Sequence, residues 1–194
     1  MAMAREFVRE QPPRSPLLAS YGNDFAAFIA TFEPARDIPY LADVAKLEAA
    51  RTRAYHAEDV MPCGAEQFAT IDPSAIPDIR IDLHPSTGIV RSRYPVVTIW
   101  AMNSGEAEPG PLEDISGEDA VIVRPQLDVE VRKLPPGGAA FLLALARGLT
   151  LREAAGAGLA DRSEFDLTCN LAGLIGSGLA CGFAVPDSKE WRTP

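Results

Sequence analysis

The sequence predicts an α+β protein with a mainly helical N-terminal domain and a small winged-helix-like α/β domain at the C-terminus. Three observations support this fold class. Apolar residues recur at helical spacing in the first third of the chain, and a strand pair followed by helical patterns occupies its last third. An acidic segment rich in glycine and proline separates these two regions. With 194 residues, the chain is long enough for two small domains.

The N-terminal region reads as three helices. Residues 4–10 form the first, which ends at a run of glutamine and prolines. Ser15 and Pro16 provide a hydroxyl cap and a first-turn proline for a second helix across residues 17–32, which Gly22 weakens in the middle. A third helix is expected over residues 39–57, where apolar side chains again follow helical spacing.

The sequence pattern changes after residue 62, where long helical spacing gives way to short segments. One or two helical turns are expected over residues 66–71. Ile79, Ile81 and Leu83 alternate with charged residues, which predicts a half-buried strand. The segment 96–102 stays open between two interpretations: its β-branched residues favour a strand, whereas the preceding proline and its length also allow a helix.

The charge of the chain is concentrated in one place. The sequence has 18 basic and 27 acidic residues, for a net charge of −9. Residues 101–119 contain six of the acids and no lysine or arginine. Such a segment repels itself and cannot build a core, so it indicates a linker. We therefore predict domains at residues 1–104 and 119–194, joined by a linker at 105–118.

The C-terminal region begins as a β-hairpin. Residues 121–123 form a short apolar strand, and Leu127, Val129 and Val131 alternate with charged residues in a second one. Helices are expected over residues 139–146, from a Thr150 capping box to about residue 159, and over 164–177. Phe183 and Val185 then return as a strand. Strand, strand, three helices and strand is a winged-helix-like order.

This order raises the hypothesis of a DNA-binding transcriptional regulator, which we keep as the alternative function. A recognition helix needs lysine or arginine to meet phosphates and guanine edges. The candidate helix, residues 164–177, has neither, and it carries Glu164 and Asp166 near its start. The charges therefore disfavour DNA as a partner.

Residues able to do chemistry are sparse. The chain has two histidines and three cysteines without paired spacing. A metal site from His56, Glu58, Asp59 and Cys63 is a weaker hypothesis than a histidine placed at a helix C-terminus. We predict no catalytic, cofactor-binding or metal-binding residue, and hence no enzyme. Few cysteines, no signal peptide and no membrane-length apolar run predict a cytoplasmic location.

Four phrases carry a resemblance to a known bacterial family. They read PPRSPLLASYGNDFAAFI (residues 12–29), IPYLADVAKLEAA (38–50), DLHPSTGIVRSRYPVVTIW (82–100) and VIVRPQLDVEVRKLPPGGAAFLLALARGLTLREA (121–154). Together they resemble the family long labelled a DNA-binding domain, which includes the HvfC/BufC/MbnC-type partner subunits of iron-dependent peptide-modifying enzymes. The phrases cover most of the chain and are specific in combination.

The resemblance implies a non-catalytic accessory subunit. In such pairs a TIM-barrel enzyme holds the iron and oxidises cysteines of a ribosomally made precursor peptide, while the partner docks on the enzyme and helps to hold the peptide. Family members usually have a further helical layer before the point where this chain starts. We therefore expect either an apolar groove left open in the first domain or a chain that is part of a longer one.

The predicted hairpin offers a place for such a peptide. An unpaired strand edge accepts an extended peptide through main-chain hydrogen bonds. We expect this edge on residues 121–123 or on residues 127–131. The candidate contact residues are Val121, Val123, Leu127, Val129 and Val131.

Overall fold

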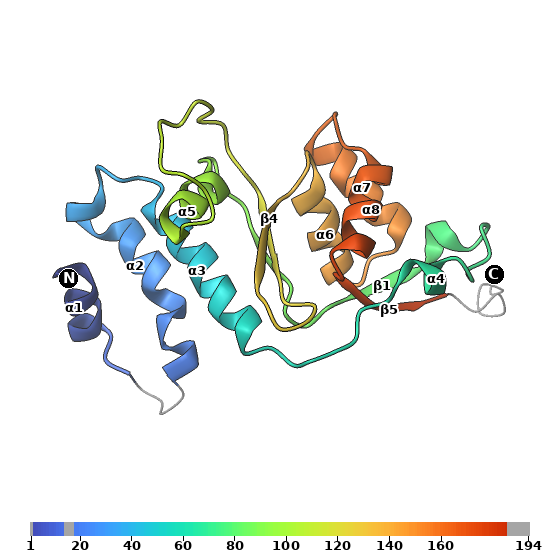
Figure 1. The fold of residues 1–194 in the computed structure, drawn as a ribbon, viewed down its shortest axis with the longest axis horizontal. Helices are drawn as coiled ribbons and strands as arrows, with labels where there is room; N and C mark the ends of the chain where they lie inside the picture. The colour runs from blue at the N-terminus through green and yellow to red at the C-terminus, as the bar shows by residue number, and fades with distance from the viewer. Residues whose placement is uncertain (1, 14–17, 186–194) are drawn as a thin grey trace, which may run out of the picture.

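The structure, a computed structural model, describes residues 2–13 and 18–185. These residues form eight α-helices, three short 3-10 helices and five strands, which confirms the α+β class. Figure 1 shows the helical N-terminal part at one end, a small sheet in the middle, a second helical group beside the sheet and, at the far end, a pair of strands with short helical turns. The predicted cap at Ser15 and Pro16 lies outside the described residues. Within them, no helix combines the length and apolar character that crossing a membrane requires.

The N-terminal layer packs around phenylalanines. The expected helix after residue 17 is divided: a 3-10 helix, η1 (Leu18–Asp24), is followed by helix α2 (Phe25–Thr31). The change comes just after Gly22, the residue expected to weaken the helix. Phe7 of α1 (Ala2–Glu10) packs edge-on against Phe28 at 5.4 Å between ring centroids. With Ile29 and Ala35 of the 3-10 helix η2 (Glu33–Ala35), these residues form the first core.

Helix α3 (Leu41–Tyr55) confirms the third predicted helix and separates two cores. Leu41 and Ala45 pack against the first core. Leu47 and Ala50, at most 1% exposed, belong to a second core on the other side of the helix. Small alanines on α3 allow close approach of its neighbours, as at Gly88, where an added Cβ would lie 3.1 Å from the Ala50 Cβ.

A three-stranded antiparallel sheet follows α3. Its order is β2 (Gly88–Val90), β3 (Ala120–Val123) and β4 (Glu130–Lys133). All of β3 is buried, because β-strand side chains alternate between faces and both faces are covered. Ala120 and Ile122 enter the second core, whereas Val121 and Val123 enter a third. The predicted hairpin is confirmed by the β3–β4 pairing.

Segment 96–102, left open between strand and helix, is helix α5 (Val96–Ser104). Two contacts explain this outcome. The Glu118 carboxylate accepts the Thr98 backbone N–H at 2.9 Å, near the helix start. At the other end, Gly105 adopts φ +84°, the left-handed conformation that commonly ends helices. Trp100, 2% exposed, lies in the second core and donates its ring N–H to Glu48 of α3.

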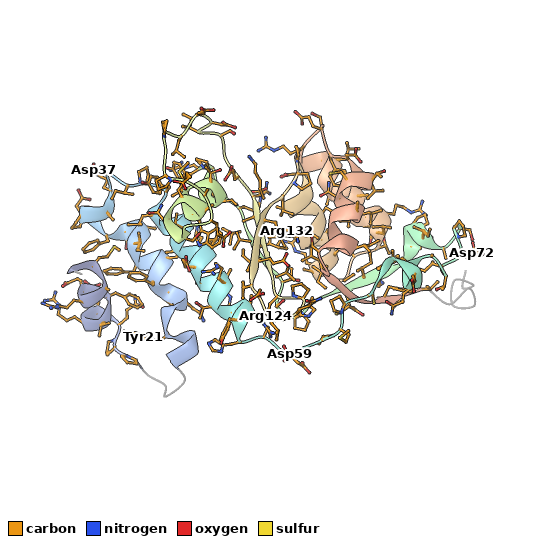
Figure 2. All side chains as sticks on the ribbon, viewed as in Figure 1. Tyr21, Asp37, Asp59, Asp72, Arg124 and Arg132 are labelled. Carbon is orange, nitrogen blue, oxygen red and sulfur yellow. The ribbon has the colours of Figure 1, made fainter. Side chains whose placement is uncertain are left out.

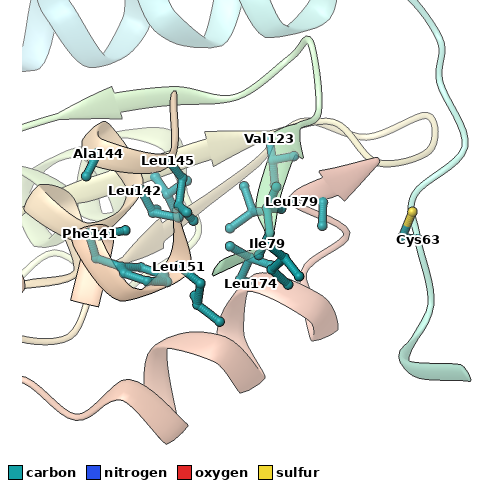
Figure 3. Packing of buried hydrophobic residues seen from close by; sticks show 14 of the residues in the cluster. Cys63, Ile79, Val123, Phe141, Leu142, Ala144, Leu145, Leu151, Leu174 and Leu179 are labelled. Carbon is teal, nitrogen blue, oxygen red and sulfur yellow. The ribbon is translucent and has the colours of Figure 1, made fainter. Parts of the chain in front are cut away.

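The third core lies between a layer of helices and a layer of strands (Figure 3). It joins helices α6 (Gly138–Ala146), α7 (Leu151–Asp161) and α8 (Leu167–Gly176) to strands β1 (Arg80–Leu83) and β5 (Ala180–Ala184). The predicted capping box is present: the Glu153 N–H donates to the Thr150 hydroxyl, and the Glu153 carboxylate accepts the Thr150 N–H. Helix α4 (Ala65–Phe68) and the 3-10 helix η3 (Ile76–Asp78) flank this core.

Two details of the C-terminal prediction differ from the structure. Helix α8 starts at Leu167 rather than near Glu164, because the Asp166 carboxylate caps it by accepting the Cys169 N–H at 3.0 Å. Strand β5 pairs antiparallel with β1 and does not join the hairpin, so the strand arrangement departs from a winged helix. Phe183 lies in β5, opposite Ile81, whereas Val185 follows the end of the strand.

The predicted division of the chain at residues 105–118 stays a prediction, but contacts cross this segment. Strand β2, before the segment, pairs with β3, after it. Strand β1 pairs with β5 in the same way, at residues about a hundred positions apart in the sequence. The segment itself has no helix or strand and ends in Glu118, whose side chain is 5% exposed. Its last residues are therefore part of the packed structure.

Candidate functional site

Val121 and Val123 cannot offer a free strand edge, which corrects one of the two expected edges. Both lie in β3, the central strand, with β2 hydrogen-bonded on one side and β4 on the other. Their side chains are 2% and 0% exposed in the third core. The two residues are thus structural, and an edge on this hairpin has to come from β4.

Within the hairpin, strand β4 carries the unpaired edge. No strand of the described residues pairs with its outer side. Leu134 donates its N–H to the Asp119 carbonyl at 2.8 Å, and the register sets Lys133 opposite Ala120 and Val131 opposite Ile122. Hydrogen-bonded and non-bonded positions alternate along an antiparallel pair. The backbone N–H and C=O groups of Val131 and Lys133 therefore point away from β3.

The other predicted residues of this strand lie around that edge. Val129 and Val131 are half-buried against the second core, so their side chains hold the strand in place rather than face a ligand. Leu127 precedes β4 in the hairpin turn and is 86% exposed. The peptide-binding role of these residues stays a prediction. Of the five, Val131 is the one whose backbone groups the structure turns outward.

A groove of about 500 Å³ runs between β4 and α8; we call it the β4 groove. Its floor is apolar, with Val121, Leu142 and Leu174 among the lining residues. Cys169, Asn170 and Ser177 line it from α8 and its end. The β4 groove therefore lies directly beside the outward-pointing backbone groups and offers apolar surface to every second side chain of an added strand.

Charged side chains fix both ends of the edge. Arg132 donates to Glu130 of the same strand and, at 3.0 Å, to the Ser177 hydroxyl across the β4 groove. Figure 2 shows Arg132 between the sheet and the helical group. Lys133 donates to the buried Glu118 carboxylate at 3.0 Å. Each charge on the strand thus has a partner within the protein, which leaves main-chain groups as the unpaired feature of the edge.

Glu118 holds the β4 edge in place through its contacts with Lys133 and with the start of α5. Burial of its carboxylate acts to raise its pKa, but hydrogen bonds from the Thr98 backbone, from Lys133 and from the Thr98 hydroxyl outweigh burial, and the pKa is lowered. A carboxyl group with a lowered pKa in the folded state stabilises the fold above its ordinary pKa, and this contribution is lost as the pH falls through the folded-state pKa.

We predict that Glu118→Gln lowers the free energy of unfolding at pH 7 by about 2 kcal/mol, because it removes a charged partner from Lys133 and from the start of α5. The loss of stability that the native protein shows below about pH 4.3 becomes smaller in the variant. Urea unfolding at several pH values measures both effects. Glu113→Gln, at an exposed position of the same segment, is the control. Equal unfolding curves for the two variants contradict the prediction.

The structure does not bring the residues of the alternative metal site together. Asp59 forms an ion pair with Arg124 at 2.6 Å, and Cys63 is buried in the third core. His56 is the residue that follows the last turn of α3, and its ring packs edge-on against the ring of Tyr55. Among the described residues, no group of three or more His, Cys, Asp or Glu side chains has an arrangement suited to a metal ion. His84, 2% exposed, contacts the Ser86 hydroxyl and the Val60 carbonyl.

Sequence reasoning missed the α8 wall of the site. Asn170, 6% exposed, donates its side-chain amide to the Asp166 carbonyl, and its Oδ1 lies where a Cβ on Gly138 would be only 2.6 Å away. The glycine at the start of α6 is thus required for close packing against α8. The signal was the Gly137-Gly138 pair, but its partner is more than thirty residues away in sequence.

Two comparisons with known proteins give no match. A scan against protein-family models finds no family model that matches the chain, and a search of curated proteins finds no similar protein.

Proposed function

We propose that this protein is a non-catalytic peptide-binding subunit that works with an iron-dependent TIM-barrel enzyme on a Cys-containing precursor peptide. The class of partner and peptide comes from the resemblance of the four sequence phrases described above. The observation that carries the binding role is the outer edge of β4, with the backbone groups of Val131 and Lys133 turned outward beside the β4 groove.

Strand addition is the binding mode that this edge favours. An extended peptide beside β4 pairs with the outward N–H and C=O groups, which gives affinity without regard to sequence. Alternate peptide side chains then enter the β4 groove, where the apolar floor selects apolar residues and the Asn170 and Ser177 side chains lie within the lining. A precursor held in this way stays extended, which suits delivery to an enzyme that modifies its side chains.

The test uses amide hydrogen exchange of the full chain. The probe is a short synthetic Cys-containing peptide of the proposed precursor class. We expect the Val131 and Lys133 amides to exchange rapidly without the peptide and at least about tenfold more slowly with it, because only they gain a new acceptor. The Arg132 amide, already bonded to β3, stays slow in both states and is the internal control.

A pair of variants at one position isolates the main-chain contact. Val131→Pro removes the outward N–H, and Val131→Ala keeps it while removing a similar amount of packing. We expect the proline variant to bind the peptide at least about tenfold more weakly than the alanine variant in fluorescence titrations. Equal affinities, or exchange at Val131 and Lys133 that the peptide leaves unchanged, contradict strand addition at β4. A gene neighbourhood without a TIM-barrel iron protein counts against the proposed partner.

A further inference from the structure

A second cavity is separate from the β4 groove. It has a volume of about 820 Å³ and is formed by the α2–α3 region, the segment 91–94 and the end of α7. We call it the arginine pocket. None of its lining residues lines the β4 groove. The five basic residues that line it are Arg36, Lys46, Arg91, Arg93 and Arg162.

The three carboxylates of the arginine pocket are each neutralised within it. Glu33 pairs with Arg36 at 2.7 Å, and Asp43 pairs with Lys46 at 2.7 Å. Asp119 pairs with Arg91 at 3.2 Å. Arg91 also pairs with Asp161 at 3.0 Å, so this guanidinium is shared between two carboxylates.

Of the five basic residues that line the arginine pocket, Arg93 and Arg162 are the two not yet accounted for. Within residues 2–13 and 18–185, neither guanidinium forms an ion pair. Arg93 lies over the Tyr94 ring at 5.0 Å, which restricts its orientation. Glu164, near Arg162 in sequence, accepts the Ser163 hydroxyl at 2.9 Å. Since Arg91 pairs with two carboxylates, those of Asp119 and Asp161, Arg93 and Arg162 are the two guanidinium groups of the pocket lining that stay open to a ligand carboxylate among the described residues.

The size and walls of the arginine pocket narrow the class of ligand. A volume of about 820 Å³ is far larger than a single carboxylate or phosphate group fills. Part of the wall is apolar, with Phe32, Pro39 and Tyr94 among the lining residues. Guanidinium groups match carboxylates in planar, bidentate geometry. A chain segment that carries carboxylates on aliphatic stems fits both the charge and the apolar surface.

We propose that the arginine pocket binds an acidic peptide segment whose carboxylates pair with Arg93 and Arg162. This inference does not rest on the β4 edge or on the proposed partner enzyme. It gives the protein a second peptide-binding surface. The arginine pocket selects acidic side chains, whereas the β4 edge selects an extended main chain.

The test measures binding of a fluorescein-labelled hexapeptide of alternating glutamate and leucine to the full chain at low salt, with the glutamine–leucine peptide as the charge control. We expect Arg93→Gln and Arg162→Gln each to weaken binding about tenfold, since each removes a charge-assisted hydrogen-bonded pair. Arg147→Gln, at an exposed arginine that ends α6, is the matched variant and leaves affinity unchanged. Raising the salt weakens binding to the native protein, as expected for partly exposed charges.

Three results overturn the proposal. They are equal affinity for the glutamate and glutamine peptides, an Arg147→Gln effect as large as that of the pocket variants, and full displacement of the peptide by equimolar inorganic phosphate. The last result assigns the arginine pocket to a small anion instead. Because the β4-edge variant Val131→Pro is expected to bind the acidic peptide normally, failure here leaves the proposed function standing, and the reverse also holds.

Discussion

Arg124→Met is expected to lower the free energy of unfolding by about 3 kcal/mol, because it removes a buried guanidinium that donates to three main-chain carbonyl groups. Arg124 follows β3 and is 7% exposed. Its guanidinium donates to the Ala54 carbonyl at 3.0 Å and to the Ala57 carbonyl at 2.6 Å, which lie at the C-terminal end of α3. It also donates to the Gln126 carbonyl within the hairpin turn.

The same side chain thus joins the end of a helix to the turn of the hairpin. Figure 2 shows Arg124 and Asp59 close together below the sheet. A cation at a helix C-terminus also interacts favourably with the helix dipole. The ion pair with Asp59 adds little, since the Asp59 side chain is 87% exposed. The expected loss therefore comes from the carbonyl groups, and Asp59→Asn has an effect below about 0.5 kcal/mol.

Chemical denaturation measures both variants, with Arg147→Met as a control at an exposed arginine. In Arg124→Met, hydrogen exchange is expected to quicken first in the last turn of α3 and in the β3–β4 turn. If Arg124→Met and Arg147→Met unfold at the same denaturant concentration, the role assigned to Arg124 is wrong.

Phe141→Ala is expected to cost about 3–5 kcal/mol of unfolding free energy, the largest effect we predict for a single substitution. Phe141 of α6 is 0% exposed in the third core, and its ring lies 5.7 Å from that of Phe165. The Phe165 ring in turn covers Gly158 of α7, where an added Cβ would lie 2.5 Å from it. Removing the Phe141 ring therefore opens a cavity at the point where α6, α7 and the entry to α8 meet.

Phe141→Leu is the matched control, since it keeps most of the volume and is expected to cost less than about 1.5 kcal/mol. Thermal unfolding and denaturant titration of both variants measure the difference. A loss below about 1.5 kcal/mol for the alanine variant contradicts this packing assignment.

Local patterns in the sequence were sufficient for most helices and strands. The Thr150 capping box and the alternation at Ile79 and Ile81 depend on neighbours within a few residues, and the structure confirms both. The segment at Val96 could not be decided in the same way. Its helix is capped by Glu118, twenty residues later, and no short-range pattern reports that contact.

Pairing partners were the main source of error. Val121 to Val123 form a continuous apolar run, which is typical of a strand buried on both faces, whereas the alternation after Leu127 is typical of an edge. This distinction would have selected β4 from the sequence. The pairing of β5 with β1 follows from packing around the third core, and the apolar residues of β5 do not specify which strand they join.

The three cores stand in a row, and neighbouring cores have a wall in common. Helix α3 faces the first and second cores, and β3 faces the second and third. If one core unfolds, the neighbouring core therefore loses the element that both share, and apolar side chains of that neighbouring core become exposed to water. A chain cut between residues 104 and 119 would give two fragments, each with apolar surface exposed to water. We therefore expect the molecule to unfold as one cooperative unit, although its outline is elongated.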